Sequence, residues 1–268
     1  MMKLGCMSLS FQDMKIEEFI QTVYDLGLDV IEFHSRAFAS TDPDYLREIK
    51  RQCMKHGLPI GYLGISNSFG KPEAELPEEV DLVKEWIDVA AFMGIPLVRI
   101  FAAYLPPGVE DEAPFWPPMI RCMKEVAVYG AEKGVMVGLQ NHNHNNLTHT
   151  GEEVLRILRE VNHPYFSHIL DTGQYVGSPG ASGQRGKPDP RYDFYGSIEQ
   201  TAPYAVYVRT KLYRMETGEE AWLDYPRIFR ILKGVGYNGC LSIVYEGEEE
   251  SLQAIKKGVT YLRSLLRV

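Results

Sequence analysis

A glycine followed by a short apolar run recurs along the whole chain, and this pattern constrains the fold more than any other feature. The first amphipathic segment ends at Gly27 and is followed by Val30–His34, and later segments end in the same way at Gly57, Gly94 and Gly134. Glycine tolerates the left-handed backbone conformation that often ends a helix. Four to six consecutive apolar residues are typical of a strand that is buried on both faces. The pattern therefore predicts helices that alternate with buried strands.

Read in this way, the sequence predicts eight strands, at residues 4–7, 30–34, 58–63, 97–101, 135–140, 167–171, 205–209 and 241–246. A helix separates nearly every pair, and a last helix is expected from about Glu249 to Leu266. Eight such units without a linker or a break in composition predict a single (β/α)8 TIM barrel over residues 1–268, in the α/β class. A doubly wound sheet is the alternative fold. No GxGxxG motif follows the first strand, which argues against that fold, and no nucleotide cofactor is expected.

Two connections that follow strands are too long to be simple turns. They span about residues 102–113, and about residues 172–196, which are rich in Gly, Pro and Ser. Loops of this length are usually lids, binding loops or disordered insertions. Because both follow strands, we expect them over the C-terminal face of the barrel, where barrel enzymes carry their active sites.

The charge and the apolar pattern argue against two classes of partner. The net charge is −8 and the chain has no Lys/Arg-rich run, so no nucleic-acid partner is expected. It has no 18-residue apolar span and no signal-peptide pattern at its start, so we expect a soluble, cytoplasmic protein without a membrane partner. The cysteines have no zinc-type spacing and are predicted to be reduced and mostly buried; they are Cys6, Cys53, Cys122 and Cys240.

Polar residues gather at the predicted C-terminal ends of the strands. The fifth strand runs into Gln140, His142 and His144, just before a helix whose first turn has Thr150 and Glu153 in capping-box spacing. Alternation along the strands indicates which side chains point toward the barrel axis. The candidates are Glu32, His34, Asn67, Arg99, Gln140, His142, His144, Asp171, Gln174, Arg209, Lys211 and Glu246. For any one of these residues alone, a purely structural role is as good an explanation as a role in ligand binding. Their convergence from at least five strands predicts a ligand site.

The chain resembles, over essentially its full length, the sugar phosphate isomerase/epimerase family with the xylose isomerase-like TIM barrel, which also includes the class II AP endonucleases. The resemblance rests on the order of the eight units and on the segments 139–142, 169–174, 208–211 and 241–246. It implies the barrel fold and a carbohydrate substrate bound at the C-terminal strand ends.

The resemblance also implies a divalent cation (Mn²⁺, Zn²⁺ or Mg²⁺), but the four matching ligand positions are Gln140, Asp171, Arg209 and Val244. Only Asp171 is a strong ligand, because a Gln oxygen binds weakly, Val cannot bind and Arg brings a positive charge of its own. The residues at these four positions therefore argue against a divalent cation bound as in the family. Glu246 has the strand parity of Val244 and could replace it one layer higher. A shifted site would use Asp171, Glu246 and His142, together with His144.

The first functional hypothesis is a sugar isomerase or epimerase that moves a proton next to a carbonyl group, and a lyase or dehydratase would use the same carbanion chemistry. His142 and Glu246 are the acid/base candidates, and Arg209 and Lys211 would stabilise the enolate oxygen. Arg209 would pair with Asp171 or with an anionic group of the ligand. The predicted substrate-binding residues are Glu32, His34, Asn67, Arg99, Gln140, His144 and Gln174.

Two other hypotheses belong to different classes. The missing metal ligands favour a sugar-binding or regulatory barrel that has lost catalysis. An AP-endonuclease-type nuclease would need many metal ligands and a basic surface, and the sequence has neither. A homo-oligomer is also considered, with Phe115, Trp116 and Trp222 either at its interface or packed on the barrel helices.

Overall fold

The computed structural model describes residues 2–11, 13–181 and 185–267. Within these residues, eight parallel strands form a closed barrel in which each strand pairs with its neighbour in sequence and β1 pairs with β8. The strands are β1 (Lys3–Met7), β2 (Val30–His34), β3 (Ile60–Gly64), β4 (Leu97–Ile100), β5 (Met136–Gln140), β6 (Phe166–Asp171), β7 (Ala205–Leu212) and β8 (Cys240–Tyr245). The predicted (β/α)8 barrel is confirmed.

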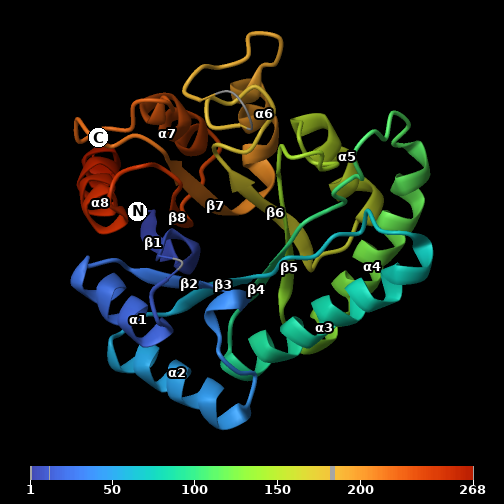
Figure 1. Ribbon diagram of the computed structural model, residues 1–268, viewed down its shortest axis with the longest axis horizontal. Helices are drawn as coiled ribbons and strands as arrows, with labels where there is room; N and C mark the ends of the chain where they lie inside the picture. Colours follow the sequence, from blue (N-terminus) through green and yellow to red (C-terminus); the bar gives the residue numbers. More distant parts are fainter. Residues whose placement is uncertain (1, 12, 182–184, 268) are drawn as a thin grey trace.

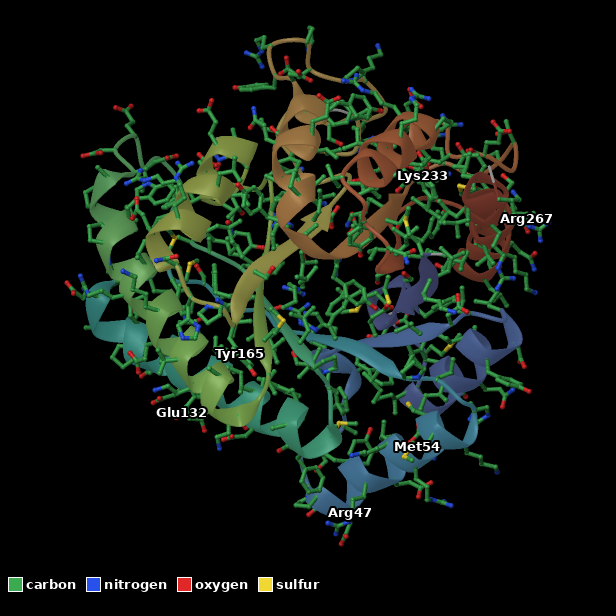
Figure 2. The ribbon with its side chains drawn as sticks, turned by 180° about the vertical axis from the view of Figure 1, so that it is seen from behind. Arg47, Met54, Glu132, Tyr165, Lys233 and Arg267 are labelled. Carbon is green, nitrogen blue, oxygen red and sulfur yellow. The ribbon has the colours of Figure 1, made fainter. Side chains whose placement is uncertain are left out.

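Helices surround the strands on the outside (Figure 1). They are α1 (Ile16–Asp25), α2 (Pro43–Lys55), α3 (Leu76–Met93), α4 (Trp116–Lys133), α5 (Gly151–Val161), α6 (Phe194–Thr201), α7 (Tyr225–Gly234) and α8 (Ser251–Arg267). The predicted stops at Gly94 and Gly134 are left-handed, with φ of 75° and 72°, and the capping box of Thr150 and Glu153 is present at α5. Figure 2 shows Arg47 on α2 and Arg267 on α8 at the outer edge of the molecule.

The first helix begins at Ile16, because Lys15 before it has an extended backbone with ψ of 150°. One predicted boundary differs from the structure. The predicted loop 172–196 ends at Asp193, whose carboxylate accepts a hydrogen bond from the backbone N–H of Gly196 (2.9 Å) and so begins α6. Part of that predicted loop, residues 182–184, lies outside the described residues.

Buried apolar side chains form two cores, one on each face of the strands. A small inner cluster comprises Met7, Tyr62, Leu97, Ile169, Tyr207 and Val244. The larger cluster lies between the strands and the helices. The other side chains that point into the barrel are polar or charged, and they are buried as well. Buried charged groups need partners, so they must find them inside the barrel.

Several smaller predictions can be compared with the structure. Cys6, Cys53 and Cys122 are buried, Cys240 is partly buried, and all four are free thiols. Trp116 is buried in the larger core, and Phe115 and Trp222 pack partly buried against it, so these aromatic residues pack within their own chain. None of the helices in the described part of the chain has both the length and the apolar character needed to cross a membrane.

Candidate active site

Asp171, the last residue of β6, lies at the centre of a buried polar cluster. Its Oδ2 atom accepts hydrogen bonds from Gln140 Nε2 and from Arg209 Nε, both at 3.0 Å, and Lys211 Nζ lies 3.7 Å from the same oxygen. The strand register brings about this contact, because Asp171 is the direct partner of Arg209 on β7. All four side chains are 3% exposed or less. The predicted pairing of Asp171 with Arg209 is therefore present, shielded from water.

Lys211 links this cluster to the mouth of the barrel. Its Nζ atom donates a hydrogen bond to Glu246 Oε1 at 2.5 Å. The Lys211 side chain is 1% exposed, whereas that of Glu246 is 47% exposed. Burial alone would raise the pKa of Glu246, but the charge and the hydrogen bond of Lys211 outweigh this and hold the pKa below its ordinary value. Glu246 is thus an ionised carboxylate that a ligand in the mouth can reach.

The position of Val244 agrees with the predicted strand parity. Val244 is the register partner of Lys211 and packs inside the barrel, and Glu246 follows it two residues later, just after the end of β8. A cavity of about 750 Å³ adjoins Glu246 and is lined also by Ser10 from the segment after β1 and by Glu18 of α1, but not by Lys211 or Asp171. Glu246, rather than Val244, is therefore the exposed carboxylate at the end of β8.

His142 and His144 lie in the loop after β5 and not on the strand, so the alternation along β5 that indicates inward-facing residues does not extend to them. The chain folds back at this point, because Thr148 Oγ1 accepts a hydrogen bond from the N–H of His142 (3.1 Å) and donates one to the carbonyl of Gln140 (3.3 Å). The loop thereby holds both imidazoles near the mouth.

The two histidines have different surroundings. The ring of His142 packs edge-on against Phe101 and Tyr104, with ring centroids 5.1 and 5.5 Å away. Its Nδ1 atom lies 3.3 Å from the backbone N–H of His144, which donates to it. Burial, together with the charges of His144 and Lys211, lowers the pKa of His142 to about 2, so this ring is neutral. Burial also lowers the pKa of the more exposed His144, while the carboxylate of Glu246 opposes that change.

Three of the predicted binding residues form hydrogen bonds with the protein's own backbone. Both amide atoms of Asn67 bind the backbone of Phe101, at 3.0 and 2.9 Å. Arg99 donates from Nη1 to the carbonyl of Ile65 (2.6 Å) and stacks over the Phe101 ring. His34 accepts a hydrogen bond from the N–H of the second residue after it, and burial lowers its pKa to about 2. These three side chains are therefore occupied by the fold, and Asn67 and Arg99 hold Phe101 in place.

The remaining two predicted amides each keep an acceptor free. Gln140 and Gln174 are 1% and 3% exposed, and their Oε1 atoms have no hydrogen-bond partner among the described residues. A buried carbonyl oxygen without a partner is costly, and bound hydroxyl groups would satisfy it. These two oxygens are therefore candidates to accept hydrogen bonds from a polyol ligand.

Glu32 lies in the interior of the barrel in a tight contact with Tyr207. The phenol of Tyr207 donates to Glu32 Oε1 at 2.5 Å, across 175 positions of sequence. Two glycines make room for this pair: a Cβ atom at Gly5 would collide with the Glu32 carboxylate, and one at Gly61 would collide with the Tyr207 hydroxyl. Burial raises the pKa of Glu32 to about 8, although the hydrogen bond from Tyr207 opposes the rise.

The raised pKa of Glu32 predicts a specific dependence of stability on pH. The carboxyl group is protonated in the folded protein at neutral pH, so its contribution to stability is complete below the ordinary pKa of 4.5 and is lost as the pH rises through about 8. Glu32→Gln removes this titration. Between about pH 5 and about pH 9, we expect the free energy of unfolding of the wild type to fall relative to Glu32→Gln by roughly a few kcal/mol in urea titrations. A constant difference would contradict this, and Glu17→Gln on the exposed face of α1 is the control.

Sequence reasoning missed several aromatic residues of the site. Tyr62 accepts a hydrogen bond from Arg209 Nη1 (2.7 Å), and its ring packs edge-on against Tyr207. Strand parity could have found Tyr207, which lies two residues before the predicted Arg209. No sequence pattern identifies Phe101 and Tyr104, because they enter the site through the course of the loop after β4 and its contact with His142.

The residues at the expected metal positions do not fit a divalent cation. Within residues 2–11, 13–181 and 185–267, no three His, Cys, Asp or Glu side chains are grouped so that they could hold a metal ion. Asp171 Oδ2 is already bound by Arg209, and Lys211 lies between Asp171 and Glu246. The predicted ligands Asp171, Glu246 and His142 are therefore not grouped as a metal site, and the amine of Lys211 occupies the place between the two carboxylates.

Comparisons with known proteins were consistent with this architecture. The family model of the xylose isomerase-like TIM barrel matches residues 20–265. A search of curated proteins found no match. Among solved structures, D-psicose 3-epimerase from Clostridium cellulolyticum H10 superposes with a TM-score of 0.80 at 17% identity, covering 100% of this chain and 99% of that one. L-ribulose 3-epimerase gives 0.80 at 18% identity (100% and 95%), and 3-keto-D-glucoside 4-epimerase from E. coli gives 0.76 at 15% (100% and 100%). At these identities the likeness shows the fold.

Proposed function

Because the chain belongs to the family of xylose isomerase-like TIM barrels, we propose that it is a sugar isomerase or epimerase that moves a proton next to a carbonyl group. The observation that carries the proposal is the ionised, reachable carboxylate of Glu246 in contact with the buried amine of Lys211. A carboxylate base beside a cation is what enolisation needs, since the base removes the proton and the cation stabilises the oxygen that becomes negative. The solved epimerases of the same fold support this class of reaction.

In this reaction Glu246 removes the proton from the carbon next to the carbonyl group. Lys211 and, behind it, Arg209 provide positive charge for the enolate oxygen, and Asp171 keeps both cations in place. Epimerisation requires a second proton-transfer group on the opposite face of the substrate. His144 suits this role better than His142, because it is the more exposed ring and lies in the loop that follows β5, a strand that is not a neighbour of β8 in the barrel.

The polar and aromatic surroundings suit a sugar. The Oε1 atoms of Gln140 and Gln174, which have no partner within the part of the chain that the structure describes, can accept hydrogen bonds from hydroxyl groups. Phe101, Tyr104 and His142 form an aromatic wall whose rings can cover the apolar face of a sugar. The residues do not fit a divalent cation, so no step is assigned to one. A second candidate, a sugar-binding barrel without catalysis, is favoured by the same departure from the family's ligand set.

Hydrogen exchange in D₂O tests the proposal. The protein, first treated with a chelator, is incubated with ketoses such as D-psicose, D-tagatose and L-ribulose, and the sugars are followed by NMR and chromatography. We expect deuterium at the carbon next to the carbonyl group of at least one sugar, together with an isomerised product. Thermal stabilisation by a sugar without exchange would favour the binding barrel. Exchange that appears only when a divalent metal is restored would contradict the assigned roles of Lys211 and Arg209.

A further inference from the structure

Lys211 differs from the other lysines of ion pairs in the described chain by its burial and its neighbours. Its side chain is 1% exposed, whereas the paired Lys3, Lys71, Lys84, Lys133 and Lys257 are between 27% and 61% exposed. Its amine contacts two carboxylates, Glu246 Oε1 at 2.5 Å and Asp171 Oδ2 at 3.7 Å, and it shares the second with Arg209. An amine that is shielded from water and touches a carboxylate that can take up its proton is activated as a nucleophile toward carbonyl compounds.

Glu246, the partner of Lys211 at the mouth, is accessible to a ligand. Glu246 Oε1 lies 2.5 Å from Lys211 Nζ, and its carboxylate is the part of the cluster that a ligand meets first. Asp171 does not need Lys211 to balance its charge, because it also pairs with Arg209 at 3.0 Å. A ligand that draws Lys211 away from Glu246 therefore leaves no unpaired carboxylate in the interior of the barrel.

We propose that Lys211 is a covalent catalyst that forms an imine with the carbonyl group of a ketose. This inference rests on the proposed function and names the electron acceptor of that reaction. In a barrel whose residues do not fit a divalent cation, a protonated imine performs the same task, because it accepts the electrons of the broken C–H bond as an enamine.

The steps balance without any added reagent. Glu246 accepts a proton from the Lys211 ammonium group, and the free amine adds to the carbonyl carbon to form a carbinolamine. The protonated Glu246 returns its proton to the hydroxyl group of that carbinolamine, which leaves as water, and a protonated imine remains. The Glu246 carboxylate then removes the proton from the neighbouring carbon to give the enamine. Reprotonation and addition of water release the product and restore Lys211.

Borohydride trapping tests the covalent step. The chelator-treated protein is incubated with the ketose panel, reduced with sodium borohydride and analysed by mass spectrometry of the intact chain and of its peptides. We expect a mass increase of one sugar less one oxygen atom, located on the peptide that carries Lys211. The adduct should depend on the sugar, and prior reduction without sugar should leave the mass unchanged.

Matched variants separate this adduct from random modification of lysines. Lys211→Arg keeps the positive charge beside Asp171 and Glu246 but cannot form an imine, so it should lose the adduct; circular dichroism would verify that it folds. Lys257→Arg alters a half-buried lysine that is paired with Glu249 and should retain the adduct. If the wild type gives no adduct at Lys211, the inference is overturned. Deuterium exchange in the same samples then shows whether the proposed function stands without it.

Discussion

Glu246→Gln should lower the rate of deuterium exchange into the substrate by about 10²- to 10⁴-fold, the usual contribution of a positioned general base. The amide has nearly the shape of the carboxylate and can still accept a hydrogen bond from Lys211, but it cannot take up a proton. Because the Glu246 side chain is 47% exposed, the substitution should leave the fold intact. The measurement is NMR of the sugar in D₂O, with the thermal midpoint of the variant recorded alongside.

The control for this experiment is Glu248→Gln, an exposed carboxylate two residues further along the same loop. It removes the same charge from the surface and should exchange deuterium at the wild-type rate. A Glu246→Gln variant that exchanges as fast as the wild type would show that the proton is removed by another group. The pKa of Glu246 lies below its ordinary value of 4.5. As the pH is lowered, the rate of deuterium exchange should therefore begin to fall only below about pH 4.5, where the carboxylate becomes protonated.

Asp171→Ala should destabilise the protein by about 3 to 5 kcal/mol, which is the usual cost of removing one partner from a buried ion pair. The Asp171 side chain is fully buried, and without it the guanidinium of Arg209 has no carboxylate within ion-pair distance in the described chain. The amide of Gln140 loses its acceptor as well. Equilibrium unfolding in urea measures the change, and Glu216→Ala, which breaks an exposed pair with Arg214, should leave the unfolding midpoint unchanged.

A second variant distinguishes the loss of charge from the loss of packing. The double substitution Asp171→Leu with Arg209→Leu removes both members of the pair and leaves Lys211 with Glu246. Replacing a whole buried ion pair with apolar residues is often neutral, so the double variant should be more stable than Asp171→Ala. If Asp171→Ala unfolds at the same urea concentration as the wild type, the cluster contributes little to the fold, and its buried charges would have to be explained by ligand binding alone.

The sequence predicted the strand ends of this site better than the loops. Asp171, Arg209 and Lys211 are on strands, where alternation decides which side a residue faces, and all three lie in the predicted interior. His142 follows the end of β5, and its position depends on the hydrogen bonds of Thr148, six residues away. No periodic pattern describes such a loop, so its course could not be predicted.

The sequence also could not predict which partners the buried charged residues take inside the barrel. The sequence identified Glu32 as an inward residue, but its partner Tyr207 is on the seventh strand, and the pair exists only because Gly5 and Gly61 leave space for it. The sequence left open whether Arg209 would bind Asp171 or a ligand, and the register of β6 and β7 decided this in favour of Asp171.

The sequence by itself determined the alternation of helices and strands, the closure into eight units, and the faces of the strands that point inward. These depend on helix stops and on apolar periods of a few residues, which are local properties. Only the tertiary structure decided that Lys211 lies between Asp171 and Glu246, and that Arg209 pairs with Asp171. The physical reason is that a buried charge takes its partner from whichever strand the closed barrel brings within a few ångströms, and that strand can be far away in sequence.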